Sequence, residues 1–178
     1  MGHERRLNGR LRGVDDAFAD LISANRTFAD EFPFAGLQGV AQAGVAVVTC
    51  MDSRIDPLRI LGLEPGDAKV FRNPGGHITP QALEALVLST NLLKADRILV
   101  IAHTKCAMNS PLDEMRRRVS ESAGQDVSWQ SFSVIDDQEK ALHDDVRTVR
   151  SHPLVPDAVA VGGFIYDVDT GLLNQVAG

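Results

Sequence analysis

Two short stretches of this sequence contain side chains that could together hold a metal ion. CMDSR at 50–54 begins with Cys50, whereas HTKC at 103–106 begins with His103 and ends with Cys106. Thiolate and imidazole groups are ligands that suit Zn²⁺ in proteins. Two cysteines and one histidine therefore predict a zinc site in which the protein fills three of the four tetrahedral positions.

An aspartate and an arginine accompany Cys50 within the first stretch. Asp52 lies two residues beyond Cys50, on the same face of an extended segment, so its carboxylate could become a fourth metal ligand. Arg54 lies two residues further on and could form a bidentate pair with that carboxylate. Arg54 could thus hold Asp52 away from the metal and leave the fourth position to water, which is the arrangement of a catalytic site.

Other interpretations of the two cysteines stay open at this point. A cysteine at the end of an apolar strand often only fills the core. A redox pair would form a disulfide between Cys50 and Cys106, although the sequence has no C-x-x-C motif. A purely structural zinc site would use the same ligands, but it explains poorly why Asp52 and Arg54 accompany them.

The elements that must position these residues are strands of a parallel sheet. Strands are predicted at 44–50, 68–73, 96–103 and 157–168, and they alternate with predicted helices. The first of them, 44–50, is a continuous apolar run of β-branched residues, which is typical of a strand buried on both faces. Asp169-Thr170-Gly171 then predicts a turn into a short antiparallel edge strand. The sequence therefore predicts an α/β fold with a mainly parallel four-stranded sheet, an antiparallel edge strand and flanking helices.

The carboxyl ends of parallel strands meet at one edge of a sheet, and sites in open α/β folds form there. The first predicted strand ends at Cys50, the second is followed by Gly75 and Gly76, and the third ends at His103. We therefore expect these residues to be neighbours in space despite their separation in sequence.

A predicted helix precedes the sheet. Residues 13–32 have apolar side chains at spacings of mostly three and four, namely Val14, Phe18, Leu21, Ile22, Phe28 and Phe32. This apolar stripe could pack on the protein's own core or on a second subunit.

Composition limits the class of protein. The length of 178 residues suits one domain, and the net charge of −6 argues against a nucleic acid or an anionic membrane as partner. No apolar run approaches the roughly 18–20 residues that cross a bilayer, and the first ten residues lack the apolar region of a secretory signal. We expect a cytoplasmic protein.

Three motifs in this order, C-x-D-S-R at 50–54, R-N-P-G-G at 72–76 and H-T-x-C at 103–106, resemble the beta-class carbonic anhydrases, and most of all small actinobacterial-type members. The resemblance extends from about Val14 to the final hairpin. It implies a single domain over residues 1–178.

The resemblance implies a division of that domain and an assembly. Residues 13–32 would form a dimerisation helix that lies on the partner subunit, and residues 44–178 would form the α/β core. The implied state is a homodimer or a higher homo-oligomer.

The resemblance also implies an activity, the reversible hydration of CO₂ to bicarbonate and a proton. Zn²⁺ would be bound by Cys50, His103 and Cys106, while Asp52 would orient the attacking oxygen and Arg54 would fix Asp52.

The implied substrate pocket includes Gly75, Gly76 and Ala107. Relatives usually have glycine at the position of Ala107, and many have an acidic or small residue at that of Lys105. The Lys105 ammonium would act on the metal site if it points inward and would have little effect if it points outward. His77 is a candidate proton carrier by position alone.

Two alternatives share the same ligand set. One is a hydrolase of a CO₂-like molecule such as COS or CS₂, which would differ mainly in substrate access. The other is a catalytically impaired dimer that binds zinc or an anion, with Lys105 and Ala107 as the cause of the lost activity.

Overall fold

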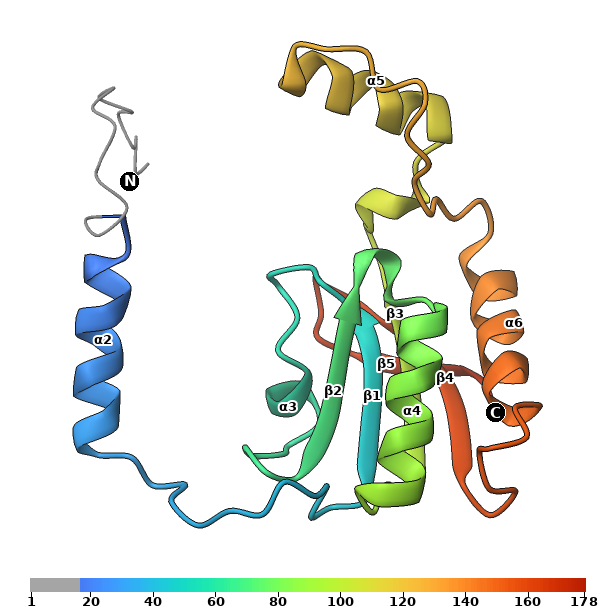
Figure 1. Ribbon diagram of the computed structural model, residues 1–178. Coiled ribbons are helices and arrows are strands. Elements are labelled where there is room, and N and C mark those ends of the chain that lie inside the picture. Colours follow the sequence, from blue (N-terminus) through green and yellow to red (C-terminus); the bar gives the residue numbers. More distant parts are fainter. Residues whose placement is uncertain (1–16) are drawn as a thin grey trace. The chain divides into compact units, whose positions relative to one another are not determined.

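The computed structural model describes residues 17–178. These residues fall into two compact units, one ending at Leu37 and the other running from Gln38 to Gly178 (Figure 1). The first unit contains helix α2 (Ala19–Asp30), which lies within the helix predicted at 13–32. Residues 13–16 of that prediction lie outside the described residues.

Among residues 17–178, helix α2 has no buried side chain. The apolar residues of the predicted stripe are roughly half exposed or more, namely Phe18, Leu21, Ile22, Phe28 and Phe32. Phe32 contacts Phe28 and Phe34 edge to face, with ring centroids 5.5 and 5.8 Å away.

The second unit is built around a five-stranded sheet of order β2-β1-β3-β4-β5. Its strands are β1 (Val45–Cys50), β2 (Ala68–Asn73), β3 (Arg97–His103), β4 (Ala160–Tyr166) and β5 (Leu173–Ala177). The first four pair in parallel, and β5 pairs antiparallel with β4. The predicted fold class is confirmed, including the antiparallel edge strand.

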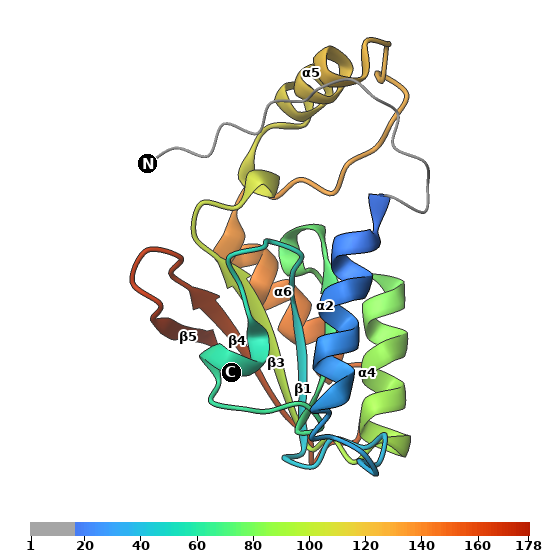
Figure 2. The same ribbon diagram turned by 90° about the vertical axis from the view of Figure 1, so that its left-hand side faces the viewer.

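Helices cover one face of this sheet more fully than the other (Figures 1 and 2). Helices α4 (Pro80–Leu92) and α6 (Gln138–Arg150) pack on one face, where they bury Leu86, Val146 and Val149 against β1, β3 and β4. The short α3 (Pro57–Ile60) packs on the opposite face. Helix α5 (Leu112–Ala123) lies beyond the carboxyl ends of the strands in both views.

Local sequence signals explain where these helices begin. Asp56 accepts a hydrogen bond from the Arg59 N–H, and Pro57 occupies the first helical position of α3. Thr79 caps α4 in the same way, with a proline directly after it. These caps fix the positions at which the chain leaves the carboxyl ends of β1 and β2.

The strand ends that carry the predicted ligands are buried. Cys50 ends β1 opposite Asn73 of β2, and His103 ends β3 opposite Tyr166 of β4. Two 3₁₀ turns follow at this edge of the sheet, η1 (Pro74–Gly76) after β2 and η2 (Ala107–Asn109) after Cys106. The sheet therefore gathers the three motifs at one place.

Residues 17–178 include no helix with both the length and the apolar character needed to span a bilayer.

Candidate metal centre

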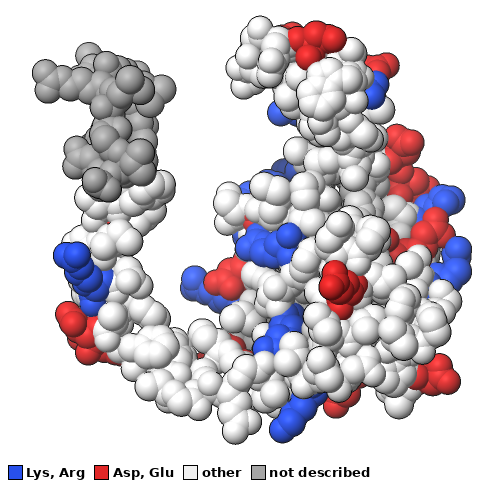
Figure 3. Space-filling model, in the orientation of Figure 1, with Lys and Arg blue, Asp and Glu red and all other residues white. Residues whose placement is uncertain are grey.

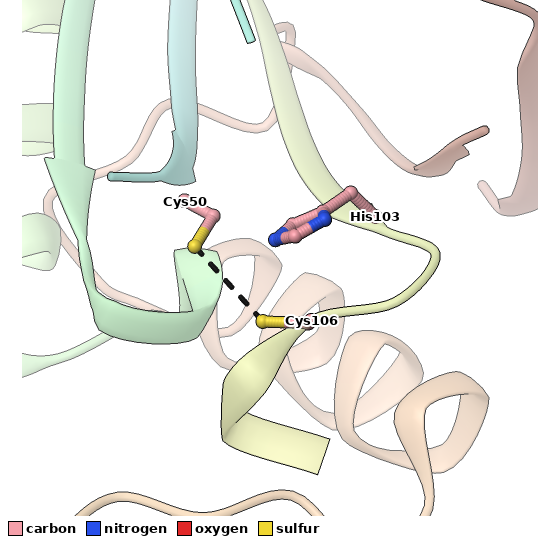
Figure 4. Close-up of side chains that lie close together, drawn as sticks. All are labelled: Cys50, His103 and Cys106. Carbon is pink, nitrogen blue, oxygen red and sulfur yellow. Dashed lines mark hydrogen bonds between the residues drawn. The ribbon is translucent and has the colours of Figure 1, made fainter. Parts of the chain in front are cut away.

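Cys50, His103 and Cys106 converge at the carboxyl edge of the sheet (Figure 4). One side-chain donor atom from each residue lies within 4.8 Å of the other two, and all three residues are buried. The two sulfur atoms are 4.0 Å apart, and neither cysteine is in a disulfide. This is the arrangement predicted from the sequence, with Cys50 and His103 at the ends of strands and Cys106 three residues beyond β3.

The histidine is oriented as a metal ligand would be. Its Nδ1 lies 2.9 Å from the carbonyl oxygen of Thr104, which can only accept, so Nδ1 carries a proton. In the neutral form of the ring that binds a metal, Nε2 then has the free lone pair. Nε2 is the one buried side-chain nitrogen or oxygen without a hydrogen-bond partner in residues 17–178. A buried polar atom left unpaired is costly, and a metal ion at this point would satisfy it.

The thiols are chemically suited to the same ion. Burial is the main cause that raises the pKa of the Cys106 thiol to about 11, and the nearby Cys50 thiol contributes a smaller part of that rise. In the metal-free protein Cys106 is therefore protonated at neutral pH, and a bound metal must displace that proton. Two sulfur donors and one imidazole match Zn²⁺, so the residues present fit the ion that the sequence predicts.

Asp52 and Arg54 form the predicted pair beside this group. Nε of Arg54 donates to Oδ1 of Asp52 at 2.9 Å and Nη2 donates to Oδ2 at 2.8 Å, while the Arg54 backbone N–H also donates to Oδ1 at 2.9 Å. The Arg54 guanidinium holds the pKa of the Asp52 carboxyl well below its usual range. Asp52 is therefore a hydrogen-bond acceptor throughout the neutral pH range.

Within this pair, Asp52 lies close to the candidate metal ligands. Its Oδ2 lies 3.9 Å from Nε2 of His103. The same oxygen accepts from Arg54, so the guanidinium competes directly with any cation placed between the carboxylate and the imidazole. Arg54 also donates to the carbonyl oxygen of Lys105, and this contact ties the pair to the loop that carries Cys106.

The glycines of the predicted pocket approach the ligands very closely. The Gly75 N–H donates to Sγ of Cys50 at 3.4 Å. Gly76 adopts a φ of +73°, and a Cβ there would lie 2.9 Å from the Cys50 nitrogen and 2.9 Å from the Ile101 carbonyl oxygen. Only glycine fits this position. Ala107 opens η2 directly after Cys106 and is exposed.

Lys105 points away from the candidate metal centre. Its ammonium pairs with the Asp169 carboxylate on the turn between β4 and β5, and its side chain is 62% exposed. Its backbone has a φ of +55°, a conformation that non-glycine residues seldom adopt. Of the two orientations considered from the sequence, the structure shows the outward one.

Replacing Lys105 with glutamine is therefore expected to change the rate of the proposed reaction by less than about twofold. The lost ion pair is exposed, and such pairs contribute at most about 1 kcal/mol to stability. Stopped-flow rates at equal zinc content would check this. A change of about tenfold or more would show that the ammonium acts on the site after all.

Two further residues, Arg72 and Gln138, hold the backbone of the candidate metal ligands in place. Nε of Arg72 donates to the Cys50 carbonyl oxygen at 2.9 Å, and its Nη2 donates to that of Asp52 at 2.6 Å, so Arg72 braces the turn that carries both. Nε2 of Gln138 donates to the His103 carbonyl oxygen at 2.9 Å. Nothing in the sequence pairs Gln138 with a residue 35 positions away.

Comparison with known proteins agrees with the motifs. The family model described as carbonic anhydrase matches residues 45–173. Beta-carbonic anhydrase 1 of Mycobacterium tuberculosis is 34% identical over 133 residues, which cover 74% of this chain and 81% of that protein. A carbon disulfide hydrolase of an Acidianus species is 31% identical over 154 residues, covering 72% of this chain and 75% of the relative.

The fold of this chain also agrees with that of a solved carbonic anhydrase. A crystal structure of a carbonic anhydrase from Streptococcus mutans superposes with a TM-score of 0.79 at 34% identity, covering 89% of this chain and 96% of that one. The matched region contains all three motifs and every strand through the start of β5. This chain therefore belongs to the carbonic anhydrase family of enzymes, in its beta class.

Proposed function

We propose that this protein catalyses the reversible hydration of CO₂ to bicarbonate and a proton, with Zn²⁺ held by Cys50, His103 and Cys106. The observation that carries the proposal is the unpaired, buried Nε2 of His103, which faces two free thiols within 4.8 Å. Zn²⁺ bound at such a site lowers the pKa of a water molecule to about 7, which makes a nucleophile available at neutral pH.

The side chains around the metal centre would orient the reaction. Asp52 is ionised and would accept a hydrogen bond from the attacking oxygen, which would fix the direction of that oxygen's lone pair. Arg54 holds Asp52 by two side-chain hydrogen bonds and keeps it from taking the fourth metal position. Gly75 and Gly76 let the backbone of their turn approach Cys50 closely, because they have no side chains.

Removing the guanidinium is expected to inactivate the enzyme without removing zinc. In Arg54→Met the Asp52 carboxylate loses its partner and can compete for the fourth metal position. We expect the rate to fall about 10- to 100-fold, as is typical when the groups that orient a metal site are lost. Stopped-flow rates and zinc content measured together would check this.

Arg59→Met is the matched control, because Arg59 is an exposed arginine of α3 whose side chain makes no hydrogen bond to any of residues 17–178. It should retain the wild-type rate. A fully active Arg54→Met protein would contradict the role given to the pair.

Carbon disulfide hydrolysis is the second candidate activity, because named carbon disulfide hydrolases are similar to this chain over about three quarters of its length. Both reactions add water to a linear molecule with an electrophilic carbon. The test is to assay the same zinc-loaded preparation with CO₂ and with CS₂. Fast CO₂ hydration supports the proposal, whereas CS₂ turnover without CO₂ hydration would replace it with the alternative.

We also propose that the protein is a homodimer or a higher homo-oligomer, with α2 on the partner subunit. Apolar side chains are exposed on both units. Val70, Leu88 and Leu92 are exposed around β2 and α4, where a groove of about 240 Å³ lies between strand and helix. Helix α4 carries a single charged residue, and Figure 3 shows mostly uncharged atoms over it. Such a surface suits an apolar helix.

Placing charges on the α2 stripe should dissociate the assembly. In a Leu21→Glu/Phe28→Glu variant two carboxylates would have to be buried at the interface, which is unfavourable without partners. Size-exclusion chromatography with light scattering should show a smaller species than wild type. Thr27→Glu, on the opposite side of α2, should leave the assembly intact. Equal masses for all three proteins would contradict this role of α2.

A further inference from the structure

A histidine–aspartate pair lies behind the Gly75–Gly76 turn and has no part in the function proposed above. Nδ1 of His77 lies 2.9 Å from Oδ2 of Asp145 on α6, and Oδ1 of Asp145 accepts the Ile78 N–H at 3.2 Å. An ionised carboxylate only accepts hydrogen bonds, so Nδ1 carries the proton. The two side chains are 21% and 15% exposed, which makes His77 part of the packed structure.

His77 also holds the Gly75–Gly76 turn in place. The Asn73 side chain accepts from the His77 N–H at 3.0 Å and donates to the His77 carbonyl oxygen at 2.8 Å. The His77 ring packs on Gly75 so closely that a Cβ on Gly75 would lie 3.0 Å from Cδ2. The Gly75 N–H then donates to Sγ of Cys50. A continuous path of contacts therefore joins Asp145 to a candidate metal ligand.

Helix α6 also contacts a second candidate metal ligand, His103, from the same side. Gln138 lies seven residues, about two turns, before Asp145 and so shares its face of the helix. Its side chain donates to the His103 carbonyl oxygen at 2.9 Å. Between these residues and Gly76 is a cavity of about 10 Å³, which has room for one water molecule at most. The His77 ring therefore has little freedom to move independently of Gly75.

We propose that His77 and Asp145 are positioning residues that aim the Gly75 N–H at the Cys50 sulfur and so tune the metal centre. A hydrogen bond to a thiolate withdraws electron density from the sulfur, and a less donating sulfur leaves a bound metal more electrophilic. This inference rests on the proposed zinc site for its consequence, but the contact it explains belongs to the protein alone.

Two measurements on His77→Leu test the inference. In the Co²⁺-loaded protein, loss of the N–H···S contact raises the energy of the sulfur lone pairs, so the sulfur-to-cobalt absorption band should shift to longer wavelength. In the ¹⁵N-labelled metal-free protein, the Gly75 amide should exchange with solvent at least about tenfold faster because it has lost its acceptor.

Two further variants separate positioning from packing. His77→Asn should return both readouts toward wild type, because the Asn side-chain nitrogen can take the place of Nδ1 opposite Asp145. Asp144→Asn is the control: it removes a carboxylate from the residue next to Asp145, and that carboxylate pairs with Lys140 and Arg147 at the surface. It should leave both readouts unchanged.

The outcomes are distinguishable. If His77→Leu has the wild-type band and the wild-type Gly75 exchange rate, the inference is wrong, even if the variant melts at a lower temperature. If wild-type protein shows no sulfur-to-cobalt band, the proposed metal centre is wrong, while the amide exchange still decides whether His77 positions Gly75.

Discussion

Replacing Cys106 with serine is expected to abolish both zinc binding and CO₂ hydration. Serine has nearly the same shape, but its neutral hydroxyl is a poor ligand compared with a thiolate. The variant should contain less than about a tenth of the wild-type zinc and have less than about 1% of its rate, because water is not activated without the metal. Metal analysis and stopped-flow hydration on the same sample would measure both.

The control for Cys106→Ser is wild-type protein from which the metal has been removed. Both proteins lack the zinc-derived part of their stability, so their melting temperatures should agree within a few degrees. A Cys106→Ser protein that retains one zinc and a high rate would show that Cys106 is not a ligand.

Replacing Gly76 with alanine is expected to be the most destabilising of the substitutions considered. The added methyl group would lie 2.9 Å from the Cys50 nitrogen, 2.9 Å from the Ile101 carbonyl oxygen and 3.0 Å from the Thr49 carbonyl carbon. All three atoms belong to the backbone of β1 and β3 and cannot move aside. Overpacking of this kind costs about 1–3 kcal/mol, and the left-handed φ adds about 1–2 kcal/mol. Denaturant unfolding of the metal-free protein would measure the sum.

Gly62→Ala is the matched control, because it separates the two costs. Gly62 has a similar φ of +66°, but no atom of the described part of the chain lies within 4 Å of the position its Cβ would take. Gly62→Ala should lower the free energy of unfolding only by the cost of the left-handed φ, about 1–2 kcal/mol, and should bind zinc normally. Equal losses for both variants would show that the close approach of Gly76 to β1 and β3 is not tight.

Much of the fold could be predicted because its signals are local. The run at 44–50 is apolar and β-branched over its whole length, and the observed strand begins at Val45 and ends at Cys50. Asp56-Pro57 and Thr79-Pro80 begin helices, and these signals can be read from the sequence because a capping side chain followed by proline acts within one turn. Only the strand predicted at 157–168 is clearly shorter in the structure, at 160–166.

The convergence of Cys50, His103 and Cys106 could also be predicted, because parallel pairing puts the ends of β1 and β3 at the same edge. The Asp52–Arg54 pair followed from their spacing of two residues and appears with two side-chain hydrogen bonds. Both predictions follow from regular backbone geometry. Parallel strands end at the same edge of a sheet, and residues two apart in an extended segment lie on the same face.

The contacts that brace the site from α6 could not be predicted. Gln138 and Asp145 reach His103 and His77 only because α6 packs on the sheet at one particular angle and register. No local pattern encodes that register. The same holds for the outward orientation of Lys105, which depends on the turn at Asp169 lying beside it.

The most direct test of the central claim is to add zinc stepwise to metal-free protein and to measure CO₂ hydration after each addition. A catalytic zinc held by Cys50, His103 and Cys106 predicts a rate that rises in proportion to bound zinc and stops rising at one zinc per chain. One zinc bound per chain with no hydration at any step, or hydration that does not depend on zinc, would contradict the claim.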